Sequence, residues 1–85
     1  MDFSEALKAL KDGRKLTRKT WNGKGQFLYF VPGGNYAAQT EIAKKEFAGL
    51  VPYRAYIAIK TVQGNVVPWV ASQSDLLEDD WEIVE

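Results

Sequence analysis

The feature that most constrains this chain is the segment QFLYFV at residues 26–31, which has chain breakers on both sides. The segment is apolar at odd and even positions, so a strand formed here needs cover on both faces. Asn22-Gly23 before it is a strong signal for a hairpin turn, and the PGG triplet at residues 32–34 ends it. Residues 26–31 are therefore predicted to form a central strand, or a strand that lies under an interface.

Two further strands are predicted on either end of the chain. Residues 14–18 form a short strand with Leu16 as the buried residue, and the flanking charges suit the edge of a sheet. Residues 81–84 form the last strand. Trp81 opens it and is followed by apolar residues, so its ring is expected in the core.

A hairpin is predicted in the second half of the chain. Residues 53–61 alternate in character, which places Tyr53 and Tyr56 on opposite faces of one strand. The polar turn at residues 63–65 leads into a return strand at residues 66–70. That strand contains a proline, which cannot donate to a sheet ladder, so it belongs at an edge or carries a bulge.

The N-terminal segment is predicted to be an amphipathic helix. Asp2 and Glu5 have the spacing of a capping box, and Gly13 stands where a glycine commonly ends a helix. Its apolar face consists of Phe3, Ala6, Leu7 and Leu10.

Two shorter helices are predicted further along. A helix at about residues 38–48 would place Ile42, Phe47 and Leu50 on one face. A second, of one to two turns, opens at Ser72 with Asp75 at the capping-box spacing. The leucines that follow, Leu76 and Leu77, are expected to contact the core.

These elements predict one α+β domain over residues 1–85: a small, mostly antiparallel sheet with an N-terminal helix and one or two short helices packed on it. The 85 residues are 46% hydrophobic and 13% aromatic, which is typical of a globular chain. Eleven basic residues balance eleven acidic ones, and this balance argues against a protein that binds duplex DNA. A small aromatic domain without net charge is also expected to self-associate.

The absence of two residue types narrows the chemistry. There is no cysteine and no histidine, so disulfides, thiolate metal sites and the commonest general acid or base are excluded. No cofactor is implied. The N-terminal residues lack the features of a signal peptide, and no apolar stretch reaches the roughly 20 residues that span a bilayer. We therefore expect a cytoplasmic protein that does not enter a membrane.

Four acidic residues near the C-terminus are the only dense set of carboxylates. Asp75 and Asp79 are four apart on a short helix, a spacing at which two carboxylates can share a cation. The favoured interpretation is structural: Asp75 caps the helix, Glu78 and Asp79 are solvated, and Asp80 ends the turn. No metal is therefore expected.

The loop TWNGKG at residues 20–25 is the best candidate for an anion site. Gly23-Lys24-Gly25 offers exposed amides and an ammonium group, which suit a phosphate. From the spacing alone, an ordinary hairpin turn is the favoured explanation of the glycines. Trp21 is harder to explain as a turn residue, because an exposed indole beside cations suits a nucleotide base, a sugar or a protein interface.

Four segments of the chain together resemble the second type of Thoeris anti-defence proteins, a family of phages, prophages and bacteria. They are FSEALKALKDGRKLTRKTWNGKG at residues 3–25, YFVPG at residues 29–33, VPYRAYIAIKT at residues 51–61 and VPWVASQSDLLEDDW at residues 67–81. Only the segment at about residues 35–49 lacks a matching motif.

The resemblance implies a non-enzymatic sponge. Such proteins bind glycocyclic ADP-ribose, the immune signal of Thoeris, and some bind cyclic dinucleotides of CBASS; they hold the signal intact so that the effector stays silent. They are homotetramers with ligand pockets between protomers. The residues that match the motifs and are taken as candidate ligand contacts are Trp21, Asn22, Gly23, Lys24, Trp69, Ser72, Gln73 and Asp75.

Two rival hypotheses remain open from the residues themselves. The first is a protein-interaction or virion-associated module that uses the same aromatic surface. The second is a small phosphodiesterase that uses the carboxylates at residues 75–80 with a divalent metal.

Overall fold

The structure is a computed structural model that describes residues 1–22 and 24–85. Gly23 lies outside the described residues. Along the chain the elements are α1 (Phe3–Lys11), β1 (Lys15–Arg18), β2 (Phe27–Val31), β3 (Gly34–Ala37), α2 (Glu41–Phe47), β4 (Leu50–Tyr53), β5 (Tyr56–Lys60), β6 (Val66–Pro68), α3 (Gln73–Leu77) and β7 (Trp81–Val84).

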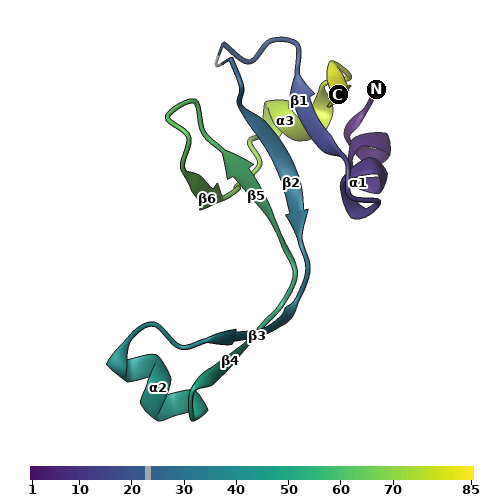
Figure 1. The fold of residues 1–85 in the computed structure, drawn as a ribbon. Helices are drawn as coiled ribbons and strands as arrows, with labels where there is room; N and C mark the ends of the chain where they lie inside the picture. The colour runs from purple at the N-terminus through teal and green to yellow at the C-terminus, as the bar shows by residue number, and fades with distance from the viewer. Residues whose placement is uncertain (23) are drawn as a thin grey trace.

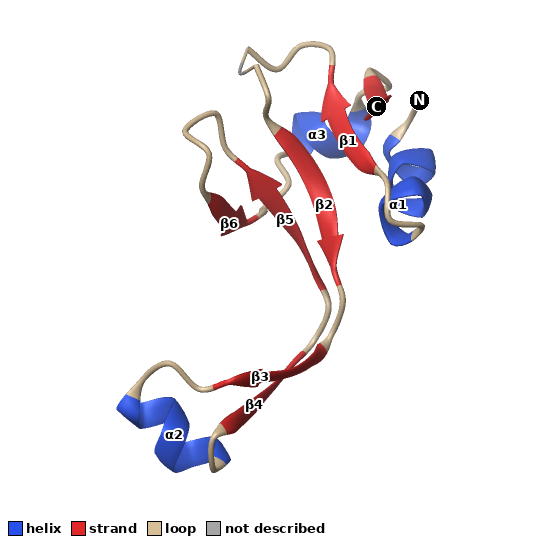
Figure 2. Cartoon of the chain, viewed as in Figure 1, coloured by secondary structure: helices blue, strands red, loops and turns tan. Residues whose placement is uncertain are grey.

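The strands form two sheets, both antiparallel. The larger has five strands in the order β6-β5-β2-β1-β7, and the smaller pairs β3 with β4 (Figure 1). Helices α1 and α3 lie beside the five-stranded sheet, whereas α2 caps the far end of the two-stranded one (Figure 2). The predicted α+β class with a mostly antiparallel sheet is confirmed.

Strand β2 is central, as its two apolar faces predict. Leu28 pairs with Leu16 on one side and Ile59 on the other, and its side chain is fully buried. Directly opposed residues share a face, so these three side chains point to the same side of the sheet. That side is the one covered by α1.

The predicted edge position of β1 is wrong, because β7 adds beyond it. Four residue pairs, from Lys15 with Val84 to Arg18 with Trp81, join the first and last strands. The charges that suggested an edge are accommodated differently: Lys15 is exposed, and Arg18 is buried against two carboxylates. A strand from the far end of the chain could not be placed by local pattern alone.

The edge position of β6 is confirmed. Among the described residues it pairs with β5 alone, with Pro68 opposite Ala58. Two backbone hydrogen bonds close the turn before it. The N–H of Thr61 donates to the carbonyl of Asn65 at 2.8 Å, and the N–H of Gly64 donates to the carbonyl of Thr61 at 3.0 Å.

The core lies between α1 and the sheet. Asp2 and Glu5 form the predicted capping box, and Gly13 has a φ of 91° just beyond the helix. The fully buried residues that define the core are Ala6, Leu10, Leu16, Leu28 and Trp81.

The segment around α2 differs most from the prediction. The helix exists but is shorter than residues 38–48, because Thr40 caps its start and Ala48 ends it in the left-handed region, at a φ of 53°. The chain therefore reverses here and the flanking residues pair as β3 and β4. The predicted common helix face is not formed, because Leu50 lies on β4 rather than on the helix, and Ile42 is 83% exposed.

A bend separates the two sheets. The predicted single strand over residues 53–61 is interrupted at residues 54–55, which belong to neither β4 nor β5. Opposite this interruption, the backbone of Gly33 packs closely against that of Tyr53. A Cβ atom added to Gly33 would lie 3.0 Å from the carbonyl oxygen of Tyr53. We call residues 34–53 the arm. The radius of gyration is 15.1 Å, against about 12 Å for a compact chain of this length, which reflects the projecting arm.

Truncation of the central core residue provides a test of this packing. Leu28→Ala should lower the free energy of unfolding by about 3 kcal/mol, because it removes buried methyl groups and leaves a cavity. Urea unfolding measures the loss. Val62→Ala, at a residue that is 56% exposed, is the control and should change stability by less than about 0.5 kcal/mol. Equal effects of the two changes would contradict the assigned core.

Candidate ligand-binding site

Trp81 is the centre of an aromatic cluster that joins the two predicted site segments. Its ring centroid lies 5.4 Å from that of Trp21 and 6.0 Å from that of Trp69, and both pairs meet edge to face. Phe3 completes the cluster at 5.5 Å from Trp81 and 5.9 Å from Trp69. Residues 48 positions apart in the sequence thus contact the same indole.

This position corrects the expectation that Trp21 stands free in its loop. The side chain is half-buried and packs on the core through Trp81. The loop can fold back in this way because residues 19–26 between β1 and β2 are longer than a two-residue turn. Part of the Trp21 side chain remains exposed to solvent.

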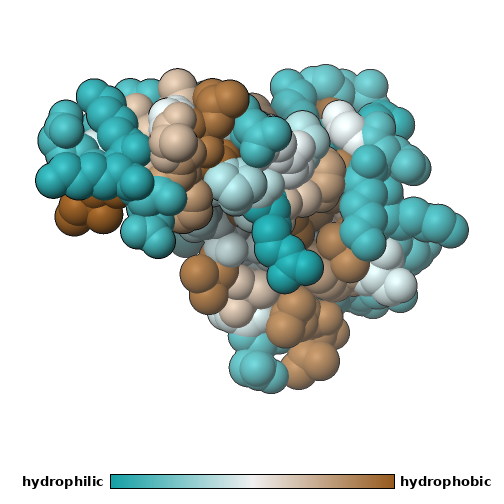
Figure 3. All heavy atoms as spheres, turned by 90° about the horizontal axis from the view of Figure 1, so that it is seen from below, coloured by the Kyte–Doolittle hydropathy of each residue, from teal (hydrophilic) through white to brown (hydrophobic). Residues whose placement is uncertain are grey.

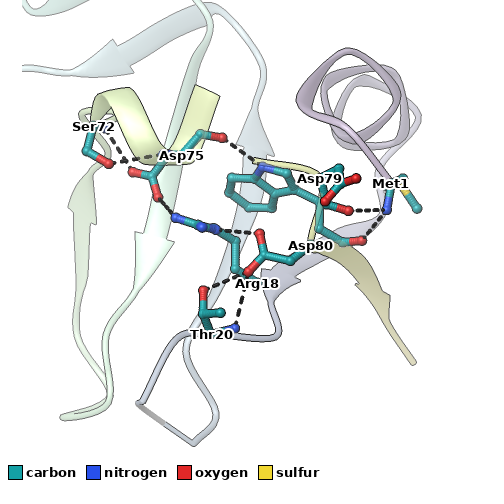
Figure 4. A network of polar contacts seen from close by, with 8 residues as sticks. Met1, Arg18, Thr20, Ser72, Asp75, Asp79 and Asp80 are labelled. Atoms are coloured by element: carbon teal, nitrogen blue, oxygen red, sulfur yellow. Dashed lines mark hydrogen bonds and ion pairs between the residues drawn. The ribbon is translucent and has the colours of Figure 1, made fainter. Parts of the chain in front are cut away.

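Beside this cluster a buried guanidinium group links three parts of the chain (Figure 4). Arg18 donates from Nη1 to Asp75 Oδ1 at 2.9 Å and from Nε to Asp80 Oδ1 at 2.8 Å. The Arg18 and Asp75 side chains are only 9% and 11% exposed. The second oxygen of Asp75 accepts from the N–H of Ser72, and the second oxygen of Asp80 accepts from the hydroxyl of Thr20 at 2.6 Å.

The network shifts all three pKa values toward the charged forms. The hydrogen bond to Asp80 is the largest factor that raises the pKa of Arg18. Burial of Asp75 favours its neutral form, but hydrogen bonds from Ser72 and Arg18 outweigh burial, so its pKa is lowered. Hydrogen bonds from Arg18 and then Thr20 lower the pKa of Asp80 to about 2. Arginine and both carboxylates are therefore ionised at neutral pH.

The carboxylates are consequently occupied. Both oxygens of Asp75 and both of Asp80 already accept hydrogen bonds from the protein. The described residues, 1–22 and 24–85, contain no group of three acidic side chains placed to hold a metal ion. The expected capping role of Asp75 is confirmed, whereas Asp80 does more than end a turn.

The polar candidate residues at positions 72–75 have two kinds of position: some cap helix α3, and one is exposed to solvent. Ser72 and Asp75 form the predicted capping box of α3, and Gln73 is exposed at its first position. The predicted core contact of the leucines is wrong: Leu76 is 43% exposed and Leu77 is 78% exposed. The five-residue helix instead turns Asp75 inward, because Arg18 lies there.

The loop after β1 presents the remaining candidates to solvent. Asn22 and Lys24 are exposed, and the candidate Gly23 between them lies outside the described residues. The base of the loop is held to the segment before β7, since the N–H of Lys19 donates to the carbonyl of Asp80 at 3.1 Å and Thr20 donates to its side chain.

Trp69 borders an apolar hollow of about 560 Å³ on the helix side of the sheet. The hollow is formed by α1, α3 and the strands between them, with Phe3, Phe30 and Leu76 among its walls. Its size lies in the range of small-molecule pockets. Trp69 is half-buried, its backbone N–H donates to the carbonyl of Ile57 at 2.9 Å, and its ring packs against those of Phe3 and Trp81.

A second hollow of about 380 Å³ lies at the bend, on the other face of the sheet. Tyr36 and Tyr53 from the arm meet Val31, Tyr56 and Pro68 from the five-stranded sheet there. The sequence placed Tyr53 and Tyr56 on opposite faces of one strand. They share a pocket because the strand is interrupted between them.

Two features were missed by the sequence reasoning. The first is the second hollow, which we call the tyrosine pocket. It depends on the bend between the two sheets, and Pro32 and Gly33 are only a weak signal of that bend in the sequence. The buried position of Arg18 was also missed, because the charges at residues 14–18 were interpreted as a sign of a sheet edge. Its alternation with Leu16 in β1 points it inward, and an inward arginine requires carboxylate partners. Those partners are 57 and 62 residues away. The alternation in β1 could therefore indicate that Arg18 needs carboxylate partners, but it could not identify them.

The fold and site define a small α+β domain built around a tryptophan cluster and a buried arginine that is paired with two aspartates. Residues 1–84 match the Thoeris anti-defense 2-like domain, and the chain belongs to this family of anti-defence proteins. It is similar to Thoeris anti-defense 2 of Bacillus phage SP01, with 37% identity over 84 residues, which are 99% of this chain and 94% of the phage protein. Among the described residues no helix is long and apolar enough to cross a membrane.

Replacement of the buried arginine tests the network. Arg18→Met should lower the free energy of unfolding by roughly 3 kcal/mol, because Asp75 is left buried without its partner. Chemical denaturation measures the change. Arg14→Met is the matched control, since Arg14 is half exposed and 3.9 Å from its partner Glu85, and it should cost less than about 1 kcal/mol. A loss no larger than that of the control would contradict the role of Arg18.

The network also predicts acid sensitivity. The pKa of Asp80 is about 2 in the folded chain, below its ordinary value of 3.8, and that of Asp75 is also lowered. The unfolded chain therefore takes up protons first as the pH falls. The stability that these carboxylates contribute is present above about pH 5 and is lost progressively toward pH 2.

Urea midpoints measured across this range should fall more steeply for the parent than for Asp80→Asn. Glu78→Asn, at an exposed carboxylate on the same segment, is the control and should keep the steep fall. The same slope in the parent and in Asp80→Asn would count against the depressed pKa of Asp80.

Proposed function

We propose that the chain is a non-enzymatic sponge that binds a cyclic nucleotide immune signal and holds it away from its effector. Glycocyclic ADP-ribose of Thoeris is the primary ligand, and cyclic dinucleotides of CBASS are further ligands. The protein acts in the cytoplasm of the infected bacterial cell as a homo-oligomer, a tetramer by analogy with the family.

The observation that carries this proposal is the hollow beside Trp69. An indole that is positioned by Trp81 and Phe3, and that borders an apolar space of about 560 Å³, suits a planar base. Stacking of a base on an aromatic ring is worth about 1–3 kcal/mol and needs no particular base edge. Adenine would therefore stack on Trp69, and Trp21 provides a second indole on the same cluster.

The loop after β1 supplies groups for the phosphates. Lys24 offers an exposed ammonium group, and the N–H groups near Gly25 offer backbone donors. Gly25 has a φ of 78°, a conformation in which glycine carries no strain. Exposed Asn22 and Gln73 are suited to the ribose hydroxyl groups. Because Thr20 is fixed to Asp80, the loop starts from a defined position next to the tryptophans.

The same geometry favours binding without conversion of the ligand. The chain has no histidine or cysteine, and Asp75 and Asp80 are both paired with Arg18. These carboxylates would have to leave their arginine to act as a base or a metal ligand. A phosphodiesterase that uses the segment at residues 75–80 is therefore disfavoured.

The affinity that a sponge requires supports a ligand pocket shared between copies of the chain. Nanomolar binding, which competition with an effector requires, corresponds to about 12 kcal/mol. One open hollow and one exposed loop are unlike the enclosed sites that reach such values, and closure by a second protomer would bury more of the ligand. The oligomer is thus part of the proposed function.

Calorimetry with glycocyclic ADP-ribose and a panel of cyclic dinucleotides tests the proposal directly. We expect binding at micromolar concentration or tighter, and intact ligand should be recovered after heat denaturation of the complex. Recovered hydrolysis products would show an enzyme instead. If none of the nucleotides binds, the sponge hypothesis is rejected. The alternative would then be a protein-interaction module, which the exposed apolar residues of the arm favour.

A charge change in the loop tests the phosphate contact. Lys24→Gln should weaken binding about tenfold, because a charge-assisted hydrogen bond contributes roughly 1.5–3 kcal/mol. Lys8→Gln is the matched control, since Lys8 is equally exposed but lies on α1 away from the loop. Calorimetry of both variants gives the comparison, and equal affinities would place the phosphates elsewhere.

A further inference from the structure

The hollow beside Trp69 has a single charged side chain in an otherwise uncharged wall. Helix α1 contributes Phe3, Leu7 and Lys11, which are four residues apart and therefore lie along one side of the helix. Across the hollow, Phe30 of β2 and its cross-strand partner Ile57 of β5 form part of the opposite wall. Among the described residues that line the hollow, Lys11 alone carries a charge.

The ammonium group of Lys11 is available to a ligand. Its side chain is exposed, and it forms no ion pair within residues 1–22 and 24–85. The hydrocarbon part of a lysine can lie along an apolar surface while its charged end stays in water. Lys11 therefore places an unpaired positive charge at the rim of an apolar space.

The acidic groups of the two nearby helices do not offset this charge. No acidic residue of α1, of α3 or of the caps of these helices lines the hollow. Glu5 and Asp12 line a separate hollow, together with Lys8. Asp75 on α3 is bound by Arg18 at 2.9 Å. The wall of the hollow beside Trp69 is thus positive at one point and uncharged elsewhere.

The end of α1 opposes an anion only weakly. The carbonyl groups in the last turn of a helix carry partial negative charge, which repels anions. Here backbone N–H groups of Asp12, Gly13 and Arg14 already donate to the carbonyls of residues 8–10. These hydrogen bonds reduce the repulsion at the end of the helix that carries Lys11.

We propose that the hollow binds the planar, apolar part of an anionic ligand and that Lys11 binds the negative group attached to that part. A ring system placed against Trp69 and Phe30 would displace water from the hollow, whose volume of about 560 Å³ is sufficient for a base. The lower local polarity would strengthen the attraction between Lys11 and the anion.

The inference rests on the proposed function for the identity of the ligand, which is a nucleotide, and it assigns one phosphate to Lys11. Lys24 on the loop after β1 does not line the hollow, so it would meet a different part of the same ligand.

Two fluorescent probes that differ in charge test the inference without a nucleotide. Anilinonaphthalene sulfonate has aromatic rings and one negative group, whereas phenylnaphthylamine has the same rings and no charge. Lys11→Gln should weaken binding of the sulfonate about fivefold, the size expected of an exposed ion contact, and should not change binding of the neutral probe. Lys8→Gln, on the same helix but at the other hollow, is the matched control and should bind both probes as the parent does.

A second pair of variants shows where the probes bind. Figure 3 shows apolar side chains at the surface among polar ones, so the probes have other apolar surfaces to choose from. Ala71→Phe should weaken binding of both probes at least about tenfold, because Ala71 lines the hollow and the larger side chain fills it. Val70→Phe is the matched control, since Val70 is 88% exposed and does not line the hollow. Circular dichroism checks the fold, and Ala71→Leu replaces Ala71→Phe if the latter is unfolded.

Calorimetry with glycocyclic ADP-ribose then relates the hollow to the proposed function. Lys11→Gln should weaken binding about fivefold, whereas Lys8→Gln should keep the parental affinity. Because Lys11 and Lys24 would contact different parts of the ligand, the losses of Lys11→Gln and Lys24→Gln should add in the double variant.

The outcomes distinguish the inference from the proposed function. If the parent binds the sulfonate in the hollow but binds no nucleotide, the sponge is rejected and the hollow remains a site for another anionic ligand. If Lys11→Gln binds glycocyclic ADP-ribose as tightly as the parent does, the phosphate assignment is overturned and the sponge stands.

Three results with the probes would overturn the site itself. They are equal sulfonate affinity of the parent and Lys11→Gln, equal loss of both probes in Lys11→Gln, and probe binding that no filling variant at Ala71 weakens.

Discussion

The burial of Arg18 is the interaction on which the arrangement of the candidate site depends. A guanidinium group at 9% exposure requires carboxylate partners, and Asp75 and Asp80 provide them from α3 and from the segment before β7. These contacts fix the last strand beside the first one and place Trp81 at the centre of the aromatic cluster. The loop of Trp21 and the hollow of Trp69 are positioned as a consequence.

The two faces of the sheet then have different roles. On one face α1 fills the core, and the tryptophan cluster at its margin leaves an apolar hollow with an exposed polar loop nearby. The other face is aromatic and bears Lys15 and Lys60, and no helix among the described residues lies over it. A domain of this size has too few residues to cover both faces of a sheet, so its second face is available to a ligand or a partner.

The sequence predicted best the features that depend on near neighbours. The capping boxes at Asp2 and Ser72, the turn at Gly64 and the edge position of the proline-containing strand all follow from residues a few positions apart. The errors lie where distant residues decide. The outward position given to β1 was wrong because β7 joins it from the other end of the chain. Leu76 and Leu77 were placed inside, but the buried partner for Asp75 is Arg18, 57 residues away.

By itself the sequence determined the helices, the central strand, the absence of histidine and cysteine chemistry, and the family, because these depend on local pattern, composition and motifs. Only the tertiary structure decided which groups meet. It brought Trp21 and Trp69 to one indole, paired Asp75 and Asp80 with Arg18, and left Ile42 exposed on a helix that does not include Leu50. The physical reason is that burial and ion pairing depend on contacts between segments that are far apart in the sequence. Which side chains meet is therefore determined by the fold of the whole chain.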